Sequence, residues 1–286
     1  MSYFKILGFE KEPFSTSPDP EFLYLAKDHD TVLVNVLIEL RLRRGLNVIL
    51  GDVGTGKTSL SRKLIQELKE RNDFIFHIVL DPSFDDEYTL LEYLTRSFGI
   101  PSADFTQRMQ FKEGLEKFLF QKGVIEGKIV VLIIDEAQKL NEASLEALRV
   151  LLNYETNEFK LLQLVLLGQL EIHSKIMGIP NFFDRISFKY TLNPFSKEET
   201  KEMIEFRLKQ AGYNASLRLF LDDAIEEIYR YTKGYPRSIT MLCHRLLKEL
   251  ILRNKFVVDA RLIQDVISHD IKTGWHRSDF MVEKKA

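Results

Sequence analysis

The sequence is poor in cysteine, glycine and proline, with one cysteine, 14 glycines and 8 prolines in 286 residues. The single cysteine, Cys243, excludes an internal disulfide framework. Neither HxxxH nor CxxC spacing occurs, so the chain lacks the ligand pattern of a structural metal site. Because this scarcity of cysteine is typical of a reducing compartment, we expect a cytoplasmic protein.

Long apolar runs and a charge imbalance are absent as well. No run approaches the ~20 apolar residues that a bilayer-spanning helix needs, and the start, MSYFKILGFEKEPF, lacks the pattern of a signal peptide. We therefore expect an unprocessed protein without a transmembrane segment. The net charge of −2 gives no global attraction to nucleic acid or anionic membranes. Arg41, Arg43 and Arg44 form either a local basic patch or a solvated helix end.

Short apolar runs alternate with amphipathic stretches through the first two thirds of the sequence. Four runs end at Leu50, Leu80, Ile134 and Gly168, and a weaker fifth covers residues 188–192. Strands of nearly continuous Val, Ile and Leu that are separated by helices are typical of parallel sheets. The pattern predicts an α/β fold whose parallel sheet is covered by helices on both faces.

The pattern changes after Pro194, because only helical periodicity follows it. Ser196 and Glu199 have the spacing of a capping box at the start of the first of these helices. We expect three parts: an α/β domain with an N-terminal aromatic loop over 1–194, a smaller all-α lid domain over 195–272, and a C-terminal tail over 273–286.

Three glycines stand close together directly after the first predicted strand. The segment GDVGTGKT matches G-x-x-x-x-G-K-[ST] between a strand and a helical run, which is the context that supports a phosphate-binding loop. Backbone N–H groups and the helix N-terminus then face the phosphates of ATP, Lys57 reaches the terminal phosphates, and Thr58 holds Mg²⁺. The alternative, a glycine-rich turn with a solvated lysine, is disfavoured by the complete motif. The predicted nucleotide-binding residues are Gly51, Asp52, Val53, Gly54, Thr55, Gly56, Lys57, Thr58 and Ser59.

Two carboxylates follow the third predicted strand, in KIVVLIIDEAQ. Asp135 is predicted to bind Mg²⁺ through water, and Glu136 to orient and activate the attacking water. An acidic helix N-cap is the alternative for Asp135, but the phosphate loop makes the pair specific. Together the loop and the acids predict an enzyme that hydrolyses ATP.

Three more polar residues stand at the ends of predicted elements. Gln169 follows the fourth strand and is either a γ-phosphate contact or a solvated loop residue. Arg185 precedes the fifth strand, where a surface or packing role is the alternative. Arg237 opens a helix of the second domain, and since a cation is unfavourable there, an anionic partner would explain it.

In this order, the motifs resemble those of AAA+ ATPases. The residues at 7–14, the stretch PDPEFLYL, the strand ending at Gln169 and the stretch GYPRSITMLCHRLL resemble the ATPase domain of the general secretion pathway protein A (ExeA) family over nearly the whole chain. The resemblance implies Walker A at Lys57 and Thr58, Walker B at Asp135 and Glu136, sensor 1 at Gln169, the arginine finger at Arg185 and sensor 2 at Arg237. Leu170 and Asp184 depart from the family pattern.

The resemblance also implies a homo-oligomer, a ring or a filament, that assembles or remodels a partner. The sequence ends after the helical region, whereas secretion-type members continue into a membrane span and a peptidoglycan-binding region, so the choice between secretion and another role stays open. One alternative is an ATP-dependent DNA-binding regulator that acts with a transposase. Another is a nucleotide-gated scaffold with negligible hydrolysis, although Glu136 counts against it. The protein partner is left open, and DNA remains a candidate.

Overall fold

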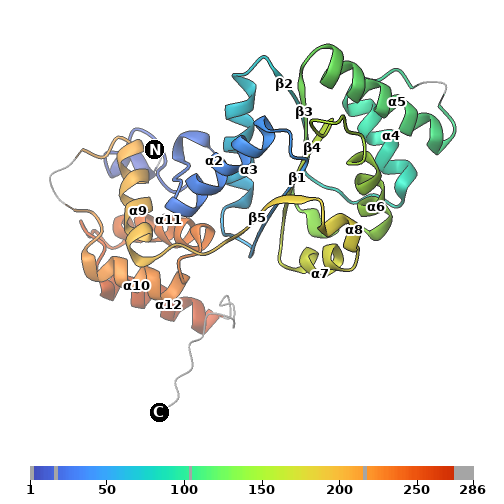
Figure 1. Ribbon diagram of the computed structural model, residues 1–286. Helices are drawn as coiled ribbons and strands as arrows, with labels where there is room; N and C mark the ends of the chain where they lie inside the picture. Colours follow the sequence, from blue (N-terminus) through green and yellow to red (C-terminus); the bar gives the residue numbers. More distant parts are fainter. Residues whose placement is uncertain (1–2, 16–18, 103–104, 215–217, 274–286) are drawn as a thin grey trace. The chain divides into compact units, whose positions relative to one another are not determined.

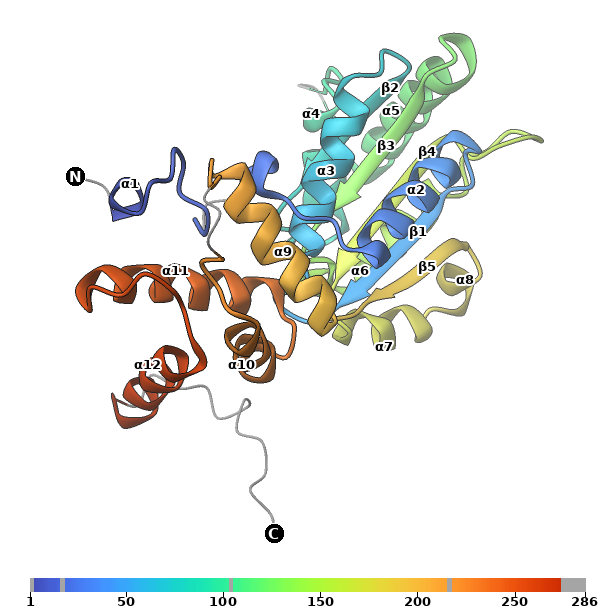
Figure 2. The same cartoon turned by 90° about the vertical axis from the view of Figure 1, so that its left-hand side faces the viewer.

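The computed structural model describes residues 3–15, 19–102, 105–214 and 218–273. The chain divides into two compact units. The unit called here the α/β unit comprises residues 27–53 and 57–193, and the helical unit draws on residues 1–26, 54–56 and 194–286. Figures 1 and 2 show the elements that make up each unit.

A five-stranded parallel sheet forms the centre of the α/β unit, with strand order β2-β3-β4-β1-β5 (Figure 1). The strands are β1 (Leu46–Gly51), β2 (Phe74–Val79), β3 (Ile129–Ile134), β4 (Leu162–Gly168) and β5 (Ile186–Leu192). Every residue of β1, β3 and β4 is buried, as expected for strands with helices on both faces. The predicted parallel α/β sheet is confirmed.

Helices cover both faces of this sheet. Figure 2 shows α2 and α3 over one face, and α4, α5 and α6 lie behind the other. Side chains along β1 point alternately to the two faces of the sheet. Leu46, Val48 and Leu50 share one face and join the apolar cluster that includes residues of α4, α5 and α6. The helices of the unit are α2 (Lys27–Arg41), α3 (Lys57–Lys69), α4 (Glu87–Ser97), α5 (Arg108–Phe120), α6 (Glu142–Leu151), α7 (Glu171–Met177) and α8 (Pro180–Phe183), with a π-helical turn η2 (Gln121–Ile125) and a 3₁₀ turn η3 (Ala137–Lys139).

The helical unit has its own apolar core, to which residues such as Ile204, Ile228 and Leu246 contribute. The predicted capping box is present, since the Ser196 hydroxyl accepts from the Glu199 N–H and the Glu199 carboxylate accepts from the Ser196 N–H. Across the described ranges, no helix combines the length and the apolar character that a membrane span requires. The elements are α1 (Tyr3–Ile6), η1 (Pro20–Phe22), α9 (Lys197–Gln210), α10 (Asp222–Thr232), α11 (Pro236–Leu252) and α12 (Ala260–Thr273).

The N-terminal aromatic segment packs within the helical unit, whereas the sequence analysis grouped it with the α/β domain. Phe9, Phe14 and Phe22 are buried in the core of the helical unit. Phe14 meets Phe220 edge-on, with ring centroids 5.9 Å apart. The sequence pattern marks these aromatic residues as buried, but burial is a local signal and does not specify which of two cores receives a side chain.

Candidate functional site

The phosphate loop begins where β1 ends, and the glycine at each of two positions is required by the backbone. Gly54 has φ +88° and Gly56 has φ +100°, values at which any side chain would be strained. α3 begins directly afterwards, at Lys57. A loop of this shape, which leads into a helix N-terminus, binds anions because free backbone N–H groups gather there.

Lys57 is only 6% exposed, and its ammonium group lies inside the loop that precedes it. It donates to the carbonyl oxygens of Gly51 and Asp52, both at 2.8 Å. Burial lowers the pKa of Lys57, while the carboxylates of Glu136, Asp135 and Asp52 act in the opposite direction. A buried cation held by neutral carbonyls is suited to receive phosphate oxygens, which add the negative charge that it lacks.

Asp135 follows β3 and is 2% exposed. Its carboxylate accepts from the N–H of Glu136 at 2.9 Å and is hydrogen-bonded to the side chain of Thr58. Burial raises the pKa of Asp135, and these two hydrogen bonds oppose the rise. A hydroxyl and a carboxylate oxygen side by side are donors that suit Mg²⁺. Over the described residues no three His, Cys, Asp or Glu side chains cluster as a metal site.

Glu136 is held in an unusual backbone conformation between β3 and η3. Its φ of +53° and ψ of +36° lie in the left-handed region, which is unfavourable for a residue with a side chain. Its carboxylate accepts a hydrogen bond of 2.6 Å from the side-chain amide of Gln138. The sequence analysis missed Gln138, although a polar residue in a short turn directly after Glu136 is a usable signal.

The strand order brings these residues together with Gln169. β4 lies between β3 and β1, and the three strands are parallel, so the residues that follow them share one edge of the sheet. Gln169 directly follows β4, and its N–H donates to the side-chain oxygen of Gln138 at 3.0 Å. The residues gathered at this edge within the α/β unit are Gly51, Asp52, Val53, Lys57, Thr58, Ser59, Asp135, Glu136 and Gln169.

Arg185 lies at the opposite edge of the sheet, because it directly precedes β5. β5 pairs Ile186 with Leu46 and Leu192 with Gly51, where the phosphate loop starts. At ~3.3 Å per residue, the strand places Arg185 on the order of 20 Å from that end. The guanidinium donates to Asn153 Oδ1 and to the carbonyl of Asn181. The structure therefore does not bring Arg185 to the phosphate loop of its own chain.

Arg237 is the second residue of α11 and is exposed at the first turn of that helix. It belongs to the helical unit, and Lys57, Asp135 and Glu136 belong to the α/β unit. Its position at a helix N-terminus agrees with the sequence reading, while its contact with nucleotide remains a prediction.

Comparisons with known proteins agree with this geometry. An AAA domain family matches residues 40–176. General secretion pathway protein A of Aeromonas hydrophila is 34% identical over 248 residues, a match that covers 86% of this chain and 44% of that protein. The chain has the fold of an AAA+ P-loop NTPase. It resembles the ATPase domain of the general secretion pathway protein A family, and it spans less than half the length of that relative.

Solved structures share this AAA+ fold at low sequence identity. The ORC2 protein of Aeropyrum pernix, solved in ADPNP and ADP complexes, superposes with a TM-score of 0.64 at 17% identity and covers 91% of this chain and 71% of its own. Drosophila ORC bound to DNA gives a TM-score of 0.66 at 16% identity, over 94% of this chain and 66% of its own. At such identities the likeness establishes the fold alone.

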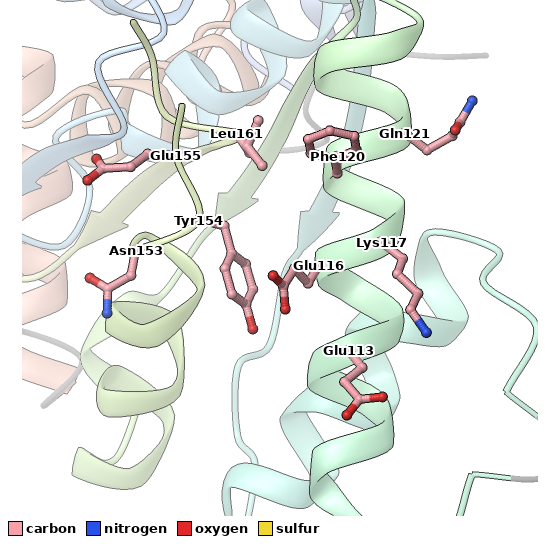
Figure 3. A pocket seen from close by; sticks show the side chains of 9 residues that line it. All are labelled: Glu113, Glu116, Lys117, Phe120, Gln121, Asn153, Tyr154, Glu155 and Leu161. Carbon is pink, nitrogen blue, oxygen red and sulfur yellow. The ribbon is translucent and has the colours of Figure 1, made fainter. Parts of the chain in front are cut away.

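A groove of about 610 Å³ lies elsewhere on the AAA+ α/β unit, between α5 and the segment 153–161 (Figure 3). Its lining includes the acidic residues Glu113, Glu116 and Glu155. Burial raises the pKa of Tyr154, and Glu116 and Glu113 add to the rise. None of the lining residues belongs to the phosphate loop or stands directly after β3 or β4, and one of them, Asn153, accepts a hydrogen bond from Arg185.

Two of the three arginines at the end of α2, for which the sequence analysis kept a basic patch as an alternative, have partners within the α/β unit. Arg41 pairs with Asp73 and lies over the ring of Phe74, 4.9 Å from its centroid. Arg43 donates to the carbonyls of Gly123 and Gly127 and also stacks on a ring. The positive charges of Arg41 and Arg43 therefore have partners within the α/β unit.

Proposed function

We propose that this AAA+ protein binds Mg-ATP and hydrolyses it at interfaces between subunits of a homo-oligomer, and that turnover drives assembly or remodelling of a partner. The observation that carries the proposal is the separation of two parts of one site. Lys57, Asp135 and Glu136 lie at one edge of the sheet, whereas Arg185 lies at the other. A second subunit is needed to bring the two parts together.

The residues at the first edge have separate roles in this proposal. Lys57 exchanges its carbonyl partners for the β- and γ-phosphates. Thr58 and Asp135 would hold Mg²⁺, which would supply positive charge against the phosphates. Glu136 accepts a proton from the attacking water, and Gln169 orients that water against the γ-phosphate.

The second subunit supplies Arg185, whose guanidinium stabilises negative charge on the γ-phosphate of its neighbour. Asn153 and the Asn181 carbonyl hold that guanidinium at its own edge of the sheet. Arg237, at the start of α11 in the helical unit, is proposed to contact the phosphates. A cation is unfavourable at a helix N-terminus, and an anionic partner would compensate for this.

The two alternatives receive less support. The DNA-binding regulator rests on the resemblance, and of the arginines that could contact DNA, Arg41, Arg43 and Arg44, the first two have partners within the α/β unit. The scaffold without hydrolysis does not require a carboxylate at position 136, yet Glu136 is held by a hydrogen bond beside the phosphate loop. The identity of the partner stays open in this proposal.

The test is steady-state ATP hydrolysis by the wild-type chain and by Glu136→Gln, with Mg²⁺ and with excess EDTA. We expect Mg²⁺-dependent turnover in the wild type and a loss of about 100-fold or more in the variant, because general-base catalysis contributes about 10²- to 10⁴-fold. Binding of a fluorescent ATP analogue should be unchanged by the substitution. Equal turnover by both proteins would reject Glu136 as the base, and no turnover by the wild type would reject the hydrolase.

A further inference from the structure

The side chain of Gln138 joins two elements of the candidate site. Its Nε2 donates to Oε2 of Glu136 at 2.6 Å, and its Oε1 accepts from the N–H of Gln169 at 3.0 Å. The two partners fix the orientation of the amide. A flipped amide would place its oxygen against a carboxylate and its NH₂ group against an N–H donor.

The turn that carries Gln138 is itself fixed to its surroundings. Lys175 of α7 donates to the carbonyls of Gln138 and Leu140, at 2.7 and 2.9 Å. Gly168, the last residue of β4, comes so close to the turn that a Cβ there would lie 3.3 Å from the Cβ of Ala137 and 3.4 Å from the backbone nitrogen of Gln138. The link from Gln138 to Glu136 therefore starts from a backbone held against the end of β4.

The link leaves a defined part of the carboxylate available. Gln138 occupies Oε2 of Glu136, so Oε1 is left to accept a proton from water. A carboxylate held at one oxygen loses rotational freedom, and this increases the fraction of time that the other oxygen spends in one direction. The left-handed backbone at Glu136, which is unfavourable for glutamate, sets the direction of its side chain. The hydrogen bond from Gln138 holds the carboxylate in that direction.

We propose that Gln138 is a positioning residue for ATP hydrolysis, which couples the end of β4 to the carboxylate of Glu136. The inference rests on the proposed function, in which Glu136 is the base and Gln169 faces the γ-phosphate. When nucleotide binding shifts Gln169, its N–H moves, and the Gln138 side chain that accepts from this N–H moves with it. Gln138 in turn shifts the carboxylate of Glu136. The presence of the γ-phosphate thereby changes the position of the Glu136 carboxylate through the side chain of Gln138.

Two substitutions separate the halves of this link. Gln138→Met keeps the length of the side chain and removes both hydrogen bonds. Gln138→Glu keeps an acceptor for the Gln169 N–H but places a second carboxylate against Glu136, which repels it. Gln264→Met is the matched control, because Gln264 is exposed on α12 in the helical unit.

The experiment measures kcat, the Kd of a fluorescent ATP analogue and the thermal midpoint for the wild type and the three variants. Loss of a residue that orients another group typically costs about 10- to 100-fold, so kcat should fall by that factor in Gln138→Met and further in Gln138→Glu. The Kd should change by less than about twofold, since neither hydrogen bond touches the phosphate loop. Gln264→Met should match the wild type in all three measurements.

A coupling test adds Gln169→Ala, which removes the side chain proposed to face the γ-phosphate but keeps the N–H that donates to Gln138, alone and together with Gln138→Met. If both residues act through one link, the double variant should lose less activity than the product of the two single losses. Wild-type kcat in Gln138→Met, or a drop in kcat that is matched by weaker binding and a lower thermal midpoint, would overturn the positioning role. A wild type without ATPase activity would overturn the proposed function and this inference together, whereas an active wild type with an unaffected Gln138→Met overturns the inference alone.

Discussion

The side-chain nitrogen of Lys57 lies 2.8 Å from the carbonyl oxygen of Gly51, the residue that ends β1. The Lys57 ammonium group is therefore held within the phosphate loop by a hydrogen bond. The side chain needs no large movement to reach an anion in the loop, so little conformational entropy is lost on binding.

Replacement of Lys57 by Ala should weaken Mg-ATP binding by about 10- to 100-fold, since charged hydrogen bonds contribute about 1.5–3 kcal/mol each. Titration with a fluorescent ATP analogue measures the loss. Lys69→Ala is the matched control, because Lys69 is exposed at the other end of α3. Unchanged affinity in a folded Lys57→Ala variant would contradict the phosphate-loop assignment.

Arg185→Ala and Glu136→Gln should each be nearly inactive alone, and mixing them should restore part of the ATPase activity. At a mixed interface one subunit contributes an intact Glu136 and its neighbour an intact Arg185, so one complete site is rebuilt. The measurement is turnover of the mixture at constant total protein.

This complementation experiment needs proof that the two variants assemble together, for example by tagged co-purification. Rescue should disappear when both substitutions are placed in every subunit. If co-assembled variants give only the average of their separate rates, Arg185 has a structural role at the start of β5.

Arg43→Ala should lower the free energy of unfolding by about 1–3 kcal/mol, because it leaves two carbonyls without their donor and removes a cation–π contact. The contacts are with Gly123, Gly127 and the ring of Phe159, whose centroid lies 4.3 Å from the guanidinium carbon. Urea unfolding measures the change, and Arg44→Ala at the neighbouring exposed position is the control. Equal stability of the two variants would leave Arg43 available for a binding role.

The helical unit should lose stability as the pH falls below about 6.5. His244 lies 2.9 Å from the Tyr3 hydroxyl and 3.1 Å from Glu12, and burial together with Lys248 lowers its pKa from 6.5 although Glu12 opposes the shift. The unfolded chain then binds more protons than the folded chain, so the free energy of unfolding falls as protons are added.

His244→Gln should flatten this dependence in urea unfolding between about pH 7.5 and 5.5. His173→Gln, at an exposed position of α7 in the α/β unit, is the control. A pH profile that His244→Gln leaves unchanged would assign the acid sensitivity to other groups.

The sequence predicted the elements of the sheet well, because strands buried on both faces carry a strong local pattern. The residues after β1 and β3 were predicted to form the nucleotide site for a similar reason, since glycine, lysine and paired acids at fixed spacing have few other uses. The order of the strands was not predictable from these patterns, because hydrophobic periodicity does not record which strands are neighbours.

Long-range contacts account for what the sequence analysis missed. Gln138 accepts a hydrogen bond from the N–H of Gln169, 31 residues away, and nothing in the local pattern indicates that the two meet. Arg43 was left as part of either a basic patch or a solvated helix end, because the carbonyls it binds, at Gly123 and Gly127, are some 80 residues distant. The N-terminal aromatic residues pack against helices near the other end of the sequence.

The backbone of Glu136 places its folding and its proposed chemistry in opposition. A φ of +53° costs a residue with a side chain about 1–2 kcal/mol relative to ordinary helical geometry, and glycine would avoid most of that cost. Glu136→Gly should relieve this backbone strain, while it removes the hydrogen bond from Gln138 and, in the proposed function, the base. In the proposed function, the carboxylate that acts on water therefore stands at a position where the backbone itself favours glycine.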